Sequence, residues 1–453
     1  MTRMRTLVAV AVLAAGACNL DITNPNSPEP IGPNPSRSEV ASAAFGILIA
    51  ARSDLADWVL DAGIIGREAY RFDGSDPRFI TEFLIGPLDP GSGAFGGDHW
   101  FEEYRTIRST NNLLTHIGTA DTLQVTLAEQ NAVRGFGETF LAYSFLMVVN
   151  SHTQDSIPLA VGGAISGPPA PFVTNDSAYA FISNLLDTAQ AHLTAAGGAG
   201  FPFVLPPGFT GFDAPATFMQ FNRALKARVE VYRGSRGCAA CYTTALTALG
   251  ASFIDTTGAA TLNDGVYMDF GTGPGDNSNV LSQDPQTSDN LVHPMLEDSA
   301  ETQSGGGLDA RLLAKTVVRP TRTVSGLTSD RSFTSYPSPS SSIPIIRNEE
   351  LILLRAEANN ALATPVAAAA DVNYIRVNSG GLAADATLGA QTPAVILGAI
   401  LKQRLYSLLY EGGHRWVDMR RTGNLAGIPI DRVGDVVHPT LPIPTDEVLA
   451  RLP

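Results

Sequence analysis

The chain has 453 residues, of which 44% are hydrophobic and 16% are charged, and its formal net charge is −14. This apolar content is enough for a large buried core and excludes an intrinsically disordered chain over most of the length. The acidic balance, without a run of Lys and Arg, argues against a nucleic-acid-binding protein. The 43 glycines and 30 prolines indicate long loops.

The N-terminus is typical of an exported lipoprotein. Arg3 and Arg5 precede an apolar run over 7–15, which is too short to span a bilayer and suits a signal peptide. Small residues then lead to Cys18, as in a bacterial lipobox. We expect residues 1–17 to be a signal peptide, Cys18 to carry a lipid, and the Pro- and Asn-rich residues 18–36 to form a flexible tether. The alternative is plain secretory cleavage that leaves a free thiol.

We find no other segment long and apolar enough to cross a membrane, so anchoring is expected to depend on the lipid. The two remaining cysteines, Cys238 and Cys241, form a C-x-x-C pair. Such a pair can be redox-active, half of a zinc site, or a local disulfide. Helices are predicted on both sides and His is sparse nearby, so a disulfide that closes a helix–helix turn is favoured.

Helical periodicity dominates the rest of the chain. Between 128 and 149, for example, Val133, Phe136, Phe140, Tyr143 and Met147 step by three and four and share one helix face. The predicted helices are 38–60, 100–117, 128–149, 176–193, 217–232, 241–249, 345–362, 366–377 and 394–410. Pairs of such helices leave apolar faces that only neighbouring pairs can cover, which predicts a mainly α, tetratricopeptide-like scaffold of stacked helical hairpins.

Two stretches interrupt the helical pattern. Residues 251–342 are rich in Gly, Pro and Ser, and residues 61–98 are similarly irregular. We expect one domain over 37–453, with a helical scaffold at about 37–250 and 343–453 and a loop-rich insertion with a few short strands at about 251–342. Long loops in a compact protein are more often functional than idle.

Several segments, in order, resemble the SusD/RagB family. The resemblance rests on the helix 99–114, with Trp100, Ile107 and Asn111, and on 132–143, 155–159, 347–358, 371–376, 400–423 and 441–447. The most specific part is 400–423, although Gln403 and Ser407 replace acids that are usual there and Gly413 is an additional residue. The charged groups of this part, Glu411, Arg415 and Asp418, are expected to form structural ion pairs, with Asp418 reaching Arg415 or Arg421, and Trp416 is expected to be buried.

The resemblance implies a surface-exposed lipoprotein of the outer membrane of a Gram-negative bacterium. Such a protein captures an oligosaccharide, or a peptide, and delivers it to a TonB-dependent, SusC-like barrel. The alternative is a protein-binding scaffold or adhesin. No enzyme motif stands out, so we expect neither catalysis nor a cofactor. A calcium ion at the loosely spaced Asp264, Asp269, Asp276 and Asp284 is less favoured than solvated loop acids.

The candidate ligand site is the segment 67–79, where aromatic rings alternate with charges after Trp58. Rings can stack on sugar faces while Arg and Asp bind hydroxyls. The candidates are Tyr70, Arg71 and Asp73, followed by Arg67, Arg78 and Trp58. In the alternative interpretation, Phe72 and Phe79 are core anchors and the charges are merely solvated. Tyr267, Phe333 and Tyr336 are weaker candidates, and Trp100 is expected in the core.

Overall fold

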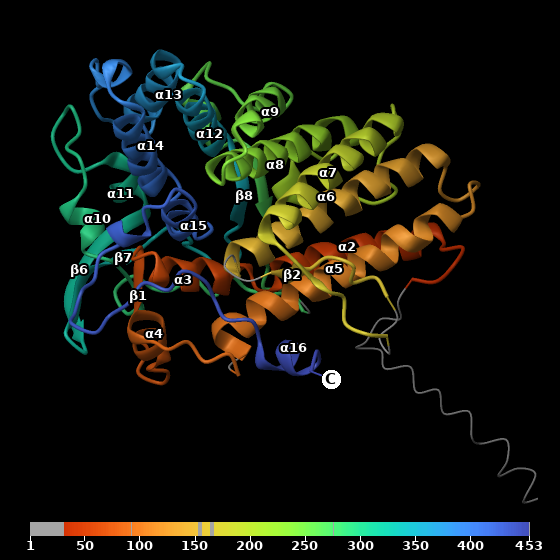
Figure 1. Cartoon of the computed structure of the whole chain (residues 1–453), viewed down its shortest axis with the longest axis horizontal. Coiled ribbons are helices and arrows are strands. Elements are labelled where there is room, and N and C mark those ends of the chain that lie inside the picture. Colours follow the sequence, from red (N-terminus) through yellow and green to blue (C-terminus); the bar gives the residue numbers. More distant parts are fainter. Residues whose placement is uncertain (1–30, 92, 153–155, 164–166, 275, 453) are drawn as a thin grey trace, which may run out of the picture.

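The computed structural model describes residues 31–91, 93–152, 156–163, 167–274 and 276–452. The fold is mainly helical with a few strands, which confirms the predicted fold class (Figure 1). The signal peptide, Cys18 and the tether up to residue 30 lie outside the described residues.

The first helical block forms most of the N-terminal half. Its helices are α2 (Arg37–Ser53), α3 (Leu55–Ile65), α5 (Asp98–His116), α6 (Leu127–Ser151), α7 (Asn175–Ala195), α8 (Pro215–Ser235) and α9 (Ala239–Gly250). Successive helices from α5 to α9 pack on one another, as stacked hairpins require (Figure 1). Reciprocal capping boxes start α2 and α6, where Ser36 pairs with Glu39 and Thr126 with Glu129.

Helix α6 is the central helix of this block. It is long and apolar enough to cross a membrane, contrary to our expectation that no segment beyond the N-terminus is, but 94% of its apolar window is buried inside the protein. Phe136 and Phe140 pack among Phe201, Phe209 and Phe218. The helix is apolar because neighbouring helices surround it.

The second helical block contains α12 (Asn348–Ala361), α13 (Pro365–Asn378), α14 (Pro393–Ser407), α15 (His414–Arg421) and the short α16 (Thr445–Leu449). Helix α12 packs against α8 and α9, so the two blocks share one core. The tail after α15 returns to the first block. There the Val436 amide donates to the Leu84 carbonyl at 2.6 Å and the Leu441 amide to the Ser151 carbonyl at 2.9 Å.

The insertion carries more regular structure than scattered strands. Strands β5 (Asn290–Val292), β6 (Thr316–Val324) and β7 (Leu327–Phe333) join β1 (Ala69–Arg71) in a sheet of order β1-β5-β7-β6. Two further pairs are β2 (Ile157–Pro158) with β3 (Phe172–Val173), and β4 (Gly265–Met268) with β8 (Ile343–Arg347).

Short helices lie in the loops along the whole chain. They are α4 (Arg78–Ile80), η1 (Thr81–Ile85), η2 (Gly93–Gly97), η3 (Ile117–Thr119), η4 (Pro207–Phe209), η5 (Ala259–Asn263), α10 (Met295–Asp298), α11 (Ala310–Lys315), η6 (Leu388–Ala390) and η7 (Leu425–Gly427).

Among the predicted helix boundaries that differ from the structure, two have a clear physical reason. The helix expected over 38–60 is interrupted at Asp54, whose carboxylate binds the buried His99 side chain, and α3 then continues to Ile65. The helix expected from residue 345 begins at Asn348, because 343–347 pair with β4 as strand β8. A β-branched, apolar run before a helix fits a strand as well as a helical turn.

The junction of α14 and α15 is a buried network of charges. Asp418 accepts hydrogen bonds from Arg404 at 2.5 Å and from Arg421 at 2.9 Å, as expected for Arg421. Arg415 instead donates to the Gly66 carbonyl at 2.8 Å. Glu411 pairs with two cations from other elements, Lys315 at 2.6 Å and Arg347 at 2.9 Å. Trp416 is fully buried, as expected.

Candidate functional site

The candidate segment 67–79 leads from α3 into an edge strand of the four-stranded sheet. Residues 69–71 form β1, which pairs antiparallel with β5, so Tyr70 lies opposite Leu291 and Arg71 opposite Asn290. Alternation along a strand sends neighbouring side chains to opposite faces. Tyr70 accordingly points into the core and Arg71 toward solvent.

Three of the six candidate residues have buried side chains. Trp58 donates from Nε1 to the Gly412 carbonyl at 3.0 Å and packs 6.0 Å from Trp416 between ring centroids. Tyr70 packs between Phe72 and His293, and burial raises the pKa of its hydroxyl. In this structure both rings are buried, at 2% and 3% exposure, and do not form a stacking surface for a ligand.

Arg67 is the third buried candidate. Its guanidinium donates to the Val436 carbonyl at 2.9 Å and lies 3.3 Å from the Asp431 carboxylate. Burial lowers the pKa of Arg67, and the charge of Asp431 opposes that effect. The residue ties β1 to the C-terminal tail, where a ligand cannot reach it.

Arg71 and Asp73 remain partly accessible, with side chains 23% and 15% exposed, and they hold each other in place. The Arg71 guanidinium donates to Asp73 at 2.9 Å and lies 4.5 Å from the centre of the Phe79 ring. Asp73 also accepts from the amide and hydroxyl of Ser75, at 2.8 and 2.6 Å. The hydrogen bonds from Ser75 and Arg71 hold the pKa of Asp73 well below its usual range.

Arg78 and Asp76 form a second pair of the same kind, a few residues further along the chain. It donates to Asp76 at 2.6 Å and stacks over Phe95, with 4.6 Å to the ring centre. Its side chain is 42% exposed. The hydrogen bonds from Arg78 lower the pKa of Asp76. Phe79 is partly buried against the core, as the alternative interpretation predicted for it.

The insertion adds two residues that the sequence did not reveal. Arg322 from β6 donates to the Phe72 carbonyl at 2.6 Å and to Asp289 at 2.5 Å. Only the register of a sheet formed by distant segments brings them beside β1. We call the set Arg71, Asp73, Asp76, Arg78, Asp289 and Arg322 the β1 rim.

The β1 rim offers ordered hydrogen-bonding groups. Paired guanidinium and carboxylate groups can donate to and accept from hydroxyls without first being immobilised, which reduces the cost of binding. Asp73 and Asp76 are both paired with Arg, and their pKa values are lowered, so they are ionised at neutral pH and cannot act as proton donors. The geometry of the rim therefore suits hydrogen bonding to ligand hydroxyl groups.

The weaker candidates in the insertion have structural contacts. Phe333 stacks on Tyr410 with 3.8 Å between ring centroids, and the Tyr336 hydroxyl donates to the Tyr410 carbonyl at 2.8 Å. The Tyr267 hydroxyl donates to the Asn263 carbonyl at 2.5 Å. Trp100 lies in the core, as expected.

The loosely spaced aspartates do not converge on one point. Asp269 accepts from the Gly208 amide at 2.5 Å and from Ser342 at 2.6 Å, whereas Asp276 pairs with Arg52. Across the residues that the structure describes, no three His, Cys, Asp or Glu side chains are grouped so as to hold a metal ion.

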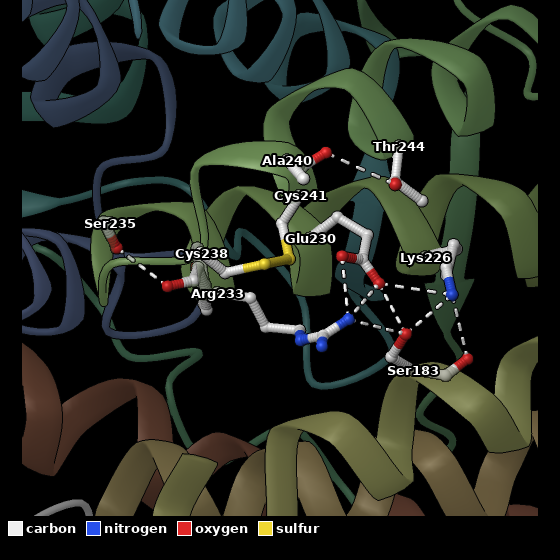
Figure 2. The surroundings of a disulfide bond; sticks show 10 residues. Ser183, Lys226, Glu230, Arg233, Ser235, Cys238, Ala240, Cys241 and Thr244 are labelled. Atoms are coloured by element: carbon white, nitrogen blue, oxygen red, sulfur yellow. Dashed lines mark hydrogen bonds and ion pairs between the residues drawn. A yellow bond between two sulfur atoms is a disulfide. The ribbon is translucent and has the colours of Figure 1, made fainter.

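Cys238 and Cys241 form a disulfide in the turn between α8 and α9, the arrangement that the sequence favoured (Figure 2). Cys241 lies in the first turn of α9 and is buried, whereas Cys238 is partly exposed. The bridge closes the end of one helical hairpin.

Comparisons with known proteins agree with this architecture. A model of the SusD family matches residues 304–429. A SusD superfamily protein from Bacteroides vulgatus aligns with a TM-score of 0.68 at 13% identity, covering 92% of this chain and 98% of the other. One from Bacteroides thetaiotaomicron aligns with a TM-score of 0.66 at 16% identity and the same coverage. A laminarin-binding SusD-like protein aligns at 0.60 and 17% identity, again covering 92% and 98%. No curated protein matches the sequence.

Proposed function

From the premise that this chain has the SusD fold and matches the SusD family model over residues 304–429, we propose that it is a carbohydrate-binding protein of the cell surface. It captures an oligosaccharide and passes it to a TonB-dependent barrel in the outer membrane. A lipid on Cys18 and the flexible tether that follows it hold the folded body at that membrane. The tether is shorter than the predicted 18–36, because Ile31 already packs in the core. One structural neighbour is a laminarin-binding SusD-like protein, which supports a glycan in preference to a peptide.

The observation that carries the proposal is the preorganised β1 rim on a helical scaffold. Two Arg–Asp pairs, at 71–73 and 76–78, are each locked internally and each stack on a Phe ring. Such groups hydrogen-bond sugar hydroxyls while keeping their orientation. The modest affinity that transfer requires is compatible with a rim that is open to solvent.

An array of neutral oligosaccharides and peptides, probed with the full chain in detergent, tests the ligand class. Asp73→Asn and Arg78→Gln should each weaken glycan retention about tenfold or more, because each removes charged hydrogen-bonding groups. Arg105→Gln is the matched control, since among the described residues the side chain of this exposed α5 residue pairs with Glu102, at 2.7 Å, and does not belong to the rim. If both rim variants bind glycans as well as the wild type does, the β1 rim is not the binding site. If the protein binds peptides alone, the proposal of a glycan ligand is refuted.

The membrane part of the proposal has its own measurement. Mass spectrometry of the mature protein should find an acylated Cys18 at its N-terminus, and Cys18→Ser should move the protein out of the membrane fraction. Crosslinking of the membrane-bound protein should capture a barrel. Recovery of soluble protein partners alone would favour a scaffold or adhesin.

A further inference from the structure

A second concave site lies on the helical scaffold, beside the disulfide. The hollow has a volume of about 310 Å³, at the lower end of the range of small-molecule sites. The start of α7, the end of α8 and the start of α9 surround it. Its lining residues are Asp176, Tyr179, Arg233, Arg236, Gly237 and Cys238. Gly237 allows the sharp turn there with a φ of +104°.

Two arginines on the last turn and cap of α8 give the hollow its charge. The hydrogen bonds of Arg233 in the described residues use Nη1, which binds Glu230 at 3.0 Å and Ser183 at 3.1 Å (Figure 2). Glu230 is also paired with Lys226 at 3.2 Å. The charge of Glu230 is therefore shared between two cations, and Arg233 retains donors for another anion.

Arg236 is held by a replaceable partner. Its guanidinium pairs with Asp176 at 2.8 Å, but the Asp176 side chain is 72% exposed, and a pair of this kind is weak. The Arg236 guanidinium lies 5.6 Å from the centre of the buried Tyr179 ring. The Tyr179 ring thus holds the Arg236 guanidinium in place, whereas the exposed Asp176 carboxylate can move into solvent.

A third arginine, Arg420, adds positive charge near Arg236 and does not form an ion pair with a described carboxylate. Arg420 of α15 donates to the carbonyls of Pro439 and Asn150 and stacks on Trp416, and no described carboxylate oxygen lies within 4 Å of its nitrogens. Burial lowers the pKa of Arg420 to about 10, and the nearby charge of Arg236 contributes to this lowering. Positive charge is therefore in local excess, although the whole chain is acidic.

The helix N-termini beside the hollow add to this local positive charge. The first turn of α7 and the N-cap Cys238 of α9 contribute lining residues, and the N-termini of these helices, of 21 and 12 residues, carry partial positive charge. Asp176 offsets part of this charge at α7, whereas no side chain caps α9. The C-terminus of α8 has the opposite sign, and Arg233 in its last turn already compensates it. We propose that this hollow binds the oxyanion of an acidic sugar, a carboxylate or a sulfate ester. The oxyanion follows from the guanidiniums, whereas the sugar rests on the proposed function.

Calorimetric titration of the full chain in detergent with glucuronate, with sulfate and with neutral glucose tests this site. We expect both anions to bind, glucose not to bind there, and the affinity to fall with added NaCl. Arg236→Gln should weaken glucuronate binding about tenfold, and Arg233→Gln similarly. Arg105→Gln should leave it unchanged, and unaltered circular dichroism would show that the variants fold.

Asp176→Asn separates ligand binding from a merely structural role. It removes the carboxylate that competes for Arg236, so glucuronate should bind about threefold more tightly. The proposal is overturned if glucuronate does not bind, if it binds both arginine variants as tightly as the wild type, or if Asp176→Asn weakens binding. Neutral glycan binding and its loss in the β1 rim variants are measured separately, so failure at one site is distinguishable from failure at the other.

Discussion

Removing the carboxylate charge of Asp418 should destabilise the fold strongly. Its side chain is 4% exposed, and within the described residues it is the only hydrogen-bond acceptor of Arg404, which is 1% exposed. Arg404 reaches Glu350 only at 3.9 Å. Removing one partner of a buried pair costs about 3–5 kcal/mol, because the other charge stays buried without compensation. Arg421 suffers less, since it keeps Glu357.

Urea unfolding followed by tryptophan fluorescence measures this cost, because the buried Trp416 lies on the same helix. Asp418→Asn should lower the midpoint by on the order of 1 M, given the steep urea dependence of a protein of this size. The surface pair supplies the control: Glu102→Gln should cost at most about 1 kcal/mol, since its partner Arg105 is 66% exposed. Equal shifts for the two variants would refute the assignment of a buried, essential pair.

The pH dependence gives an independent check on the same residue. Burial raises the pKa of Asp418, but the charges of Arg404 and Arg421 outweigh it, so the pKa lies below its ordinary value. A lowered carboxyl pKa contributes stability above the unfolded value near 4, and this contribution is lost as the pH falls. The stability of Asp418→Asn should therefore decline less steeply below pH 4 than that of the wild type.

Three further substitutions have defined outcomes. Gly413→Ala should cost about 2–4 kcal/mol in urea unfolding, because φ is +67° and the new Cβ would clash with Ala62 and lie 3.2 Å from Trp58. Gly423→Ala, with a φ of +73° and open space around it, should cost only about 1–2 kcal/mol, and equal losses would contradict the clash. Burial lowers the pKa of His152 to about 3, so the native state resists a proton that the unfolded chain accepts below about pH 6.5. Stability falls as pH falls, by about 2 kcal/mol from this residue between pH 7 and 5, and His152→Gln should abolish that part of the decline in unfolding curves at the two pH values.

The helical scaffold was predictable because its apolar periodicity is local. The stripe from Val133 to Met147 lies on α6, as its spacing predicted. The break at Asp54 gave no local signal in the sequence, and the Asp54 carboxylate there binds His99, which is 45 residues away. The position of Arg67 likewise depends on the Val436 carbonyl in the distant tail.

The sequence could not predict which residues of the candidate segment 67–79 are accessible. Alternation of rings and charges made this segment the candidate, whereas strand pairing with β5 decides that Tyr70 faces inward and Arg71 outward. Arg322 and Asp289 gave no local signal, since their contact with the Phe72 region exists only in the assembled sheet. The excess of arginine at 233, 236 and 420 also comes from three-dimensional packing.

The returning tail has a consequence for how the molecule assembles. Val436 in the tail contacts Leu84 in η1 and Arg67 just after α3, and Leu441 contacts Ser151 at the end of α6. The N-terminal part of the nascent chain therefore lacks these partners until the tail has been synthesised. Contacts over such long sequence separations slow folding and leave apolar surface open to aggregation meanwhile. Residues 304–429, excised by themselves, would lack both the tail and the N-terminal helices, and should not fold autonomously.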